Sequence, residues 1–176
     1  MQQTEIMILQ AINRLFSRAA LDYFFKYISL SASGGTIWII IALTLICFKK
    51  TRKCGICIAI SLIFCQVVGN MILKPLINRP RPFESSELIK IFISPPMGTS
   101  FPSGHSFASF ASATAIYKCS RKYGYIAFVF AFLVAFSRLY LGVHYPTDVV
   151  AGAVLGVIFG NISNILYDKF INRRLS

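Results

Sequence analysis

Residues 121–148 read RKYGYIAFVFAFLVAFSRLYLGVHYPTD, and this stretch decides the fold. Between Tyr123 and Leu141 the one charged residue is Arg138, and the run approaches the roughly 20 residues that a helix needs to cross a bilayer. It ends in a polar cluster, residues 137–148, that holds a histidine and a carboxylate. Ionisable groups beside membrane spans are costly and usually have a function. The stretch therefore predicts a transmembrane helix that carries a functional cluster to one membrane surface.

Composition places the whole chain in the same class. Of its 176 residues, 56% are hydrophobic and 14% are charged. A soluble domain of this length could not bury so much apolar surface, so we expect one integral-membrane domain over residues 1–176. The net charge of +12 is spread over short loops, which indicates contact with anionic lipid and no nucleic-acid partner.

Apolar runs divide the chain into spans. A break at residues 31–35 is either a loop or a kink, and the prolines between residues 75 and 102 predict a long non-helical connection. The fold class is therefore all-α, a polytopic helical bundle with five or six transmembrane helices. The predicted spans are 36–48 (extended by 21–33 if the break is a kink), 55–73, 103–118, 123–141 and 147–167.

The N-terminal segment has a different pattern. Ile6, Leu9 and Phe16 recur at helical spacing, with Arg14 elsewhere on the helix, which fits an N-terminal interfacial helix. Residues 1–30 are thus assigned as an amphipathic segment and residues 31–167 as the helical core. A merely structural first helix is an alternative, and the sequence leaves open whether residues 1–30 span the membrane or lie on it.

Basic loops predict the orientation. If five spans alternate, residues 49–53, 118–122 and 169–174 all lie on one side, which should be cytoplasmic. Three polar clusters, residues 74–82, 102–105 and 137–148, then face one another on the other side. We expect a multi-pass protein of the cytoplasmic membrane with an extracytoplasmic site.

The third cluster holds His144 and Asp148 on either side of Pro146. The proline prevents an ordinary unbroken helix, so the imidazole is expected in a turn and Asp148 in the first turn of the next span. Asp148 can accept a hydrogen bond from one ring nitrogen and leave the other free as a nucleophile. Helix capping is the alternative role for this carboxylate.

The other two clusters supply an anion site. Ser103 is placed as the N-cap of the third span, Gly104 allows close approach to a phosphate, and His105 can donate a proton to a leaving oxygen; an ordinary helix start is the alternative. Lys74 and Arg81 lie where the positive-inside tendency disfavours them, which indicates an anionic ligand rather than snorkelling. Cations, two imidazoles and one carboxylate together favour a phosphate ester as the ligand of this site.

The sequence closely resembles the type 2 phosphatidic acid phosphatase family, the membrane relatives of bacterial acid phosphatases and vanadium-dependent haloperoxidases. The resemblance covers roughly residues 30–167 and departs from the family at no motif position. The three motifs read here as Lys74 with Arg81-Pro82, Pro102-Ser103-Gly104-His105, and Ser137-Arg138 with His144 and Asp148.

The resemblance implies a two-step phosphoryl transfer without a metal or other cofactor. His144 would attack phosphorus and form a phosphohistidine, Asp148 would hold its ring, and His105 would protonate the leaving oxygen and later activate water. The implied phosphate-binding residues are Lys74, Arg81, Ser103, Gly104 and Arg138. Arg79 lies outside the motifs and is expected to add positive field or to contact a second phosphate.

The implied substrate is a lipid phosphate or diphosphate held in the bilayer, with no obligate protein partner. The short chain favours undecaprenyl diphosphate; phosphatidylglycerolphosphate, phosphatidic acid and lipid A 1-phosphate are alternatives, because motif residues contact phosphate and not tails. There are two other hypotheses. A haloperoxidase-like vanadate enzyme is disfavoured because the chain is small and membrane-embedded. A non-catalytic lipid-binding or transport module is disfavoured because the motifs are complete.

A few further residues carry structural expectations. Gly152, Gly156 and Gly160 recur every fourth residue and predict close helix packing. Gln66 and Asn70 are expected to bond to neighbouring helices, with a role at the substrate as the alternative. Cys54 and Cys57 are expected to be small buried residues rather than a redox or zinc pair. Glu84 and Glu87 are expected to be solvated, although a role in gating the substrate is open.

Overall fold

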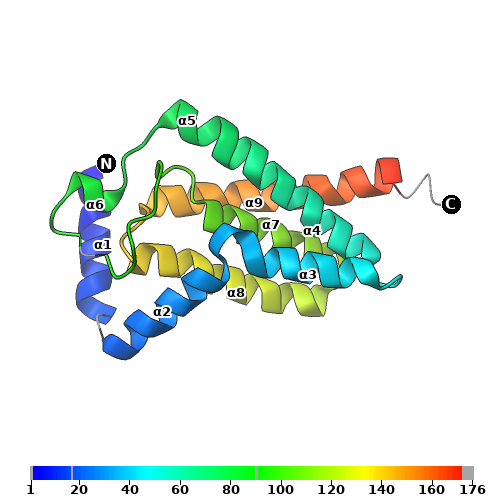
Figure 1. Ribbon diagram of the computed structural model, residues 1–176, viewed down its shortest axis with the longest axis horizontal. Coiled ribbons are helices and arrows are strands. Elements are labelled where there is room, and N and C mark those ends of the chain that lie inside the picture. The colour runs from blue at the N-terminus through cyan, green and yellow to red at the C-terminus, as the bar shows by residue number, and fades with distance from the viewer. Residues whose placement is uncertain (1, 17, 90, 172–176) are drawn as a thin grey trace.

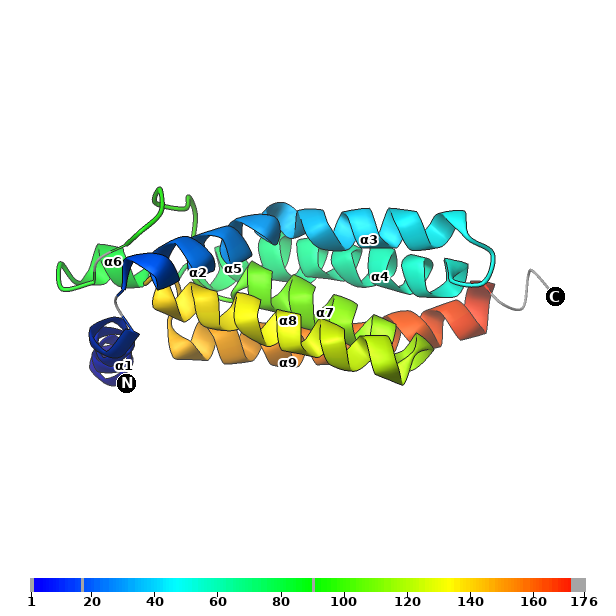
Figure 2. The same ribbon diagram turned by 90° about the horizontal axis from the view of Figure 1, so that it is seen from below.

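The computed structural model describes residues 2–16, 18–89 and 91–171, and these residues form helices joined by turns and loops. The long helices run side by side along the long axis of the molecule, and the first helix lies across one end of them (Figures 1 and 2). The helices are α1 (Gln2–Phe16), α2 (Ala19–Ser31), η1 (Ser33–Gly35), α3 (Thr36–Cys47), α4 (Arg52–Phe64), η2 (Cys65–Leu73), α5 (Lys74–Ile77), α6 (Pro82–Ser85), α7 (Gly104–Cys119), α8 (Arg121–Tyr140), α9 (Pro146–Leu166) and η3 (Tyr167–Ile171).

Three of the described helical runs are long and apolar enough to cross a membrane: 52–85, 121–140 and 146–170. A fourth span results if α2 and the η1–α3 run are taken as one, and these are bent by 42° at the predicted break. The chain is thus a multi-pass membrane protein with an all-helical fold over the described residues. The predicted count of five or six spans is not confirmed by this test.

Helix α7 explains the difference in count. It has 16 residues, many of them serine and alanine, and its residues from Ser106 to Ile116 are all buried. It packs against α9, α8 and α4, so its surface faces other helices rather than lipid. A helix so enclosed needs no apolar outer face, and length and hydropathy alone do not identify it as a span.

The second span extends further than predicted. We expected it to end at Leu73, but the helical run continues through Pro75 to Ile77. Proline is tolerated in the first turn of a helix, and here the turn of α5 follows a π-helical stretch, η2, which changes the hydrogen-bond register just before the proline. Lys74 therefore lies within a helix.

The two ends of the bundle differ in chemistry. The three polar clusters and α1 lie at one end, together with α6 and the long loop after it, whereas the turn between α3 and α4 lies at the other end (Figure 1). Residues 1–30 contain helices in two different positions: α1 lies across the bundle end, while α2 packs along α8.

The glycine repeat on α9 packs directly against α7, as the spacing predicts. A Cβ added at Gly152 or Gly160 would lie 2.6 Å from a backbone carbonyl oxygen of the α7 segment. At Gly156 it would meet the Phe107 carbonyl oxygen at 2.7 Å and the Ala111 nitrogen at 2.8 Å. Backbone atoms cannot move aside as a flexible side chain can, so these glycines fix the distance between the two helices that carry the histidines' motifs.

Replacing Gly156 by leucine should therefore destabilise the bundle, by about 1–3 kcal/mol from overpacking. Thermal unfolding in detergent measures the effect, with Val157→Leu as the control because Val157 is 38% exposed on the same helix. Equal midpoints for the two variants would contradict the close packing described here.

Candidate active site

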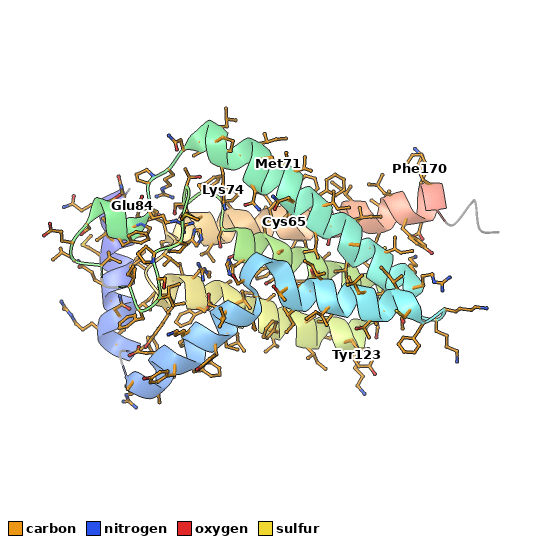
Figure 3. The ribbon with its side chains drawn as sticks, viewed as in Figure 1. Cys65, Met71, Lys74, Glu84, Tyr123 and Phe170 are labelled. Carbon is orange, nitrogen blue, oxygen red and sulfur yellow. The ribbon has the colours of Figure 1, made fainter. Side chains whose placement is uncertain are left out.

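A cavity of about 610 Å³ opens between α3, the α4–η2–α5 run, α7 and the long loop. One end of it is strongly polar, and Lys74 lies there on the inner side of its helix (Figure 3). The other end is apolar and is lined from α3 by Ile39, Leu43 and Ile46, and from α4 by Ala59, Leu62 and Ile63. All three clusters contribute residues to this polar end: Lys74, Arg81, Gly104, His105, Arg138 and His144.

The turn between α8 and α9 positions His144. Helix α8 ends at Tyr140, and Gly142 then adopts a φ of 69°, a left-handed conformation that glycine takes without strain. Helix α9 begins at Pro146, so the prediction of a histidine in a turn is confirmed. His144 is only 2% exposed, and its Nε2 lies 3.4 Å from Arg81 Nη1.

Asp148 caps α9 and faces the ring of His144, but the expected hydrogen bond to the ring is not formed. Its Oδ2 accepts a hydrogen bond from the Tyr145 backbone N–H at 2.9 Å, which caps α9. The same oxygen lies 3.6 Å from His144 Nδ1, beyond hydrogen-bond distance but within range of an ion pair. Nδ1 has no hydrogen-bond partner among the described residues. The carboxylate thus faces the ring, and a small approach would complete the bond.

Burial lowers the pKa of His144 from its ordinary value of 6.5 to about 4, because the charged ring would lose its hydration. Asp148 opposes this shift, whereas Arg138 and Arg81 add to it by repelling a positive charge. The imidazole is therefore neutral near pH 7, the form that can act as a nucleophile.

The second cluster begins α7. Ser103 is the N-cap, as predicted, and its hydroxyl accepts from the Ser106 N–H at 3.4 Å. Ser103 is fully buried and is not among the residues that line the cavity, so the structure does not bring this predicted phosphate ligand to the cavity surface. Gly104 and His105 do line it, and a Cβ at Gly104 would extend toward Lys74 Nζ, 4.0 Å away.

Arg81 is fixed by backbone oxygens. Its Nε donates to the Gly98 carbonyl at 2.8 Å and its Nη1 to the Val143 carbonyl at 3.0 Å, and the side chain is 3% exposed. Glu84 accepts from the Arg81 backbone N–H at 2.8 Å, so this glutamate caps α6 and is not merely solvated as expected. The guanidinium is therefore preorganised at the polar end of the cavity.

Arg138 reaches the cavity from α8. One Nη donates to the hydroxyl of Ser29 on α2, a partner that no sequence pattern indicated. Its Nε is buried and has no hydrogen-bond partner among the described residues. The residue itself lines the cavity, so its guanidinium charge is suited to an anionic ligand there.

Other residues differ from expectation. Arg79 does not line the cavity; its Nη1 donates to Asp148 Oδ1 at 2.6 Å, because a buried carboxylate needs a partner of opposite charge. Ser100, which no motif includes, donates to Asp148 Oδ2. Gln66 and Asn70 bond to each other at 2.7 Å within η2 rather than to neighbouring helices, and both line the cavity.

The comparisons with known proteins agree with this arrangement. The family model of the PAP2 superfamily matches residues 52–171. An undecaprenyl-diphosphatase of Sulfolobus acidocaldarius is 36% identical over 68% of the chain, although the chain spans only 58% of that relative. The crystal structure of Aquifex aeolicus LpxE superposes with a TM-score of 0.79 at 30% identity, covering 89% of this chain and 92% of that one.

A PAP2-type phosphatidylglycerolphosphate phosphatase from Bacillus subtilis is also similar, with a TM-score of 0.76, 26% identity and coverage of 96% of this chain and 87% of that one. The family match covers most of the chain and includes all three clusters, from Lys74 to Asp148. The fold, the clusters and the family match lead to one conclusion: this chain is a member of the PAP2 superfamily.

Proposed function

We propose that the protein is a membrane lipid phosphatase that forms a phosphohistidine on His144. The observation that carries the proposal is the two-ended cavity: cations and both histidines at one end, and apolar side chains of α3 and α4 at the other. A lipid phosphate has this same division, with an anionic head group joined to an apolar tail. A soluble phosphate ester would leave the apolar end without a partner.

The proposed reaction has two steps. Nε2 of His144 attacks phosphorus, the bond from phosphorus to the leaving oxygen breaks, and His105 gives that oxygen its proton. His105 then takes a proton from water as the water oxygen attacks phosphorus and the N–P bond breaks. Asp148 faces Nδ1 and stabilises the ring while it carries positive charge.

The cations would hold the phosphate oxygens. Lys74, Arg81 and Arg138 line the polar end, and the first-turn amides of α7 add a helix N-terminus. Ser103 would act indirectly, by capping α7 and orienting those amides. A divalent cation has little reason to bind among three positive side chains, and the carboxylate that faces His144, Asp148, already pairs with Arg79. We therefore propose catalysis without a metal.

The substrate we favour is undecaprenyl diphosphate. Its single prenyl chain suits a groove between two helices, and the amides of Gln66 and Asn70 could bond a second phosphate beside the first. The Sulfolobus relative bears the name of this activity. Phosphatidylglycerolphosphate, phosphatidic acid and lipid A 1-phosphate are the competing substrates; the Bacillus relative is named for the first of these. A panel of these four lipids with purified protein decides between them.

The proposed setting is the cytoplasmic membrane, with the site on the extracytoplasmic side. If α7 crosses with its neighbours and α2–α3 form one bent span, five spans alternate. The turn between α3 and α4 then lies on the cytoplasmic side with its basic residues, and α1 lies across the outer surface as an interfacial helix. A cysteine at Glu84 that reacts with an impermeant reagent in intact cells would support this orientation.

His144→Ala should reduce phosphate release by at least about 1,000-fold, because loss of a nucleophile removes the covalent route. Phosphate release from each lipid of the panel measures it, with Lys118→Gln at the opposite end of the bundle as the matched control. Unchanged turnover in a folded His144→Ala variant would remove the catalytic assignment.

The pH profile offers a second test. Because burial holds the pKa of His144 near 4, its neutral form persists as the pH falls below 6.5, so kcat/KM should decline only as the pH approaches about 4. Dialysis against a chelator should leave the profile unchanged. An acid limb at 6.5 or above, or loss of activity on metal removal, would contradict this account.

Blocking the apolar end tests where the tail lies. Ala59→Trp should raise KM for a long-chain lipid phosphate several-fold while leaving hydrolysis of a short, water-soluble phosphate ester unaffected, since the added ring fills the groove and not the polar end. Val129→Trp is the control, because Val129 is 63% exposed on the outside of α8. Equal effects of Ala59→Trp on both substrates would contradict tail binding there.

A further inference from the structure

The N-terminal helix contributes a buried carboxylate to the region behind the proposed nucleophile. Glu5 of α1 is 7% exposed although it lies on an otherwise amphipathic helix across the bundle end (Figures 1 and 2). Its Oε2 accepts from Arg79 Nη2 at 2.5 Å, and its Oε1 accepts from the Thr147 hydroxyl at 2.6 Å and the Thr147 N–H at 3.1 Å. Burying a carboxylate is costly, so these bonds give it a defined position.

Arg79 joins this carboxylate to the one that faces His144. Its Nη1 lies 2.6 Å from Asp148 Oδ1 and 2.7 Å from the Thr147 hydroxyl, so the guanidinium bridges the two acids. The guanidinium carbon is 3.9 Å from the centre of the Tyr145 ring, which fixes its plane. A planar, forked donor held in this way sets the direction of both carboxylates.

The two oxygens of Asp148 therefore have separate tasks. Oδ1 pairs with Arg79 on the side away from the cavity, while Oδ2 receives Ser100 and the Tyr145 N–H and faces His144 Nδ1. Rotation of the carboxylate about its own axis would break the Arg79 pair. The arginine thus holds Oδ2 toward the ring.

The charges of Glu5, Arg79 and Asp148 also affect the stability of a positive charge on His144. One arginine stands between two carboxylates, which leaves one net negative charge on the group of three. With Glu5 neutral, Arg79 would cancel Asp148, and the ring would face only the positive charges of the cavity. Glu5 therefore leaves the negative charge of Asp148 available to stabilise a positively charged imidazole.

We propose that Glu5 and Arg79 are positioning residues that orient Asp148 and balance its charge, so that α1 is part of the active site. The inference rests on the proposed phosphohistidine mechanism for its kinetic consequence and on the contacts described above for its geometry. Neither residue lines the cavity, so their effect reaches the substrate through Asp148 and His144.

Kinetics of Glu5→Gln and Arg79→Gln test the proposal. We expect kcat to fall about 10- to 100-fold with KM changed by less than about twofold, the scale seen when partners that orient metal ligands are lost. Arg79→Lys should recover part of kcat, and the double variant should be no worse than Arg79→Gln alone because the two residues act through one carboxylate. Two controls sit on α1: Arg14→Gln, which is exposed, and Gln2→Ala, which removes a 3.1 Å bond to Tyr145 without touching the acids.

A second readout separates this inference from the proposed function. The chain has two histidines, so ¹⁵N-histidine NMR can follow the pKa of His144 directly. Arg79→Gln should raise that pKa, because Asp148 loses its cancelling charge, and Glu5→Gln should lower it; a merely structural role would not give opposite signs. The charged and titratable groups that act on or share the cavity with His144 are Asp148 from α9, Arg138 from α8, Arg81 beside α6, Lys74 from α5 and His105 from α7.

The inference would be overturned if Arg79→Gln and Glu5→Gln shift the pKa of His144 in the same direction or leave it unchanged. It would also be overturned if Gln2→Ala lowers kcat as much as Glu5→Gln does. A wild-type protein that releases no phosphate from any lipid of the panel would instead overturn the proposed function. Opposite pKa shifts in that protein would still support the positioning of Asp148.

Discussion

A single buried carboxylate connects the three polar clusters of the site. Asp148 is fully buried, and an uncompensated charge there would destabilise the fold by several kcal/mol. Its partners come from different parts of the chain: Arg79 after α5, Ser100 in the long loop and the Tyr145 N–H in the turn before α9. Its own backbone carbonyl accepts from the Ser103 N–H at 3.0 Å and so joins the start of α9 to the start of α7. The need to satisfy this one group brings the three motifs to one place.

Packing between the helices of the bundle supports that arrangement. Close contact between the glycines of α9 and the backbone of α7 sets the spacing of the two helices that begin beside the two histidines. The α4–η2–α5 run carries Lys74 at the charged end of the cavity and Ala59, Leu62 and Ile63 at the apolar end. One helical run thus contributes to both ends, which a lipid phosphate requires.

Much of this could be predicted from the sequence, because the signals are local. Hydropathy gives the spans that become the α4–η2–α5 run, α8 and α9, Pro146 predicts the turn around His144, and alternation of the predicted spans puts the three clusters on one side. The Ser103 cap was also predictable, since its pattern lies within four residues. Hydropathy could not predict that α7 is the enclosed centre of the bundle, because a helix surrounded by protein does not need the apolar surface of a membrane span.

The long-range pairs could not be predicted from the sequence, for a different reason. Glu5 and Arg79, Ser29 and Arg138, and Ser100 and Asp148 meet only in the folded chain, and no periodicity links their positions. Arg79 was expected to add positive field to the pocket or to contact a second phosphate, yet its side chain pairs with two carboxylates instead. The buried polar groups decided its direction, and their positions depend on tertiary structure.

The most direct test of the account is a structure of the protein with vanadate, which mimics the pentacoordinate phosphorus of the proposed transition state. We expect vanadium bonded to Nε2 of His144, with the vanadate oxygens contacting Lys74, Arg81 and Arg138. We expect His105 beside the oxygen that lies opposite the bond from Nε2 to vanadium. Vanadate bound away from His144, or bonded to any other side chain, would contradict the mechanism.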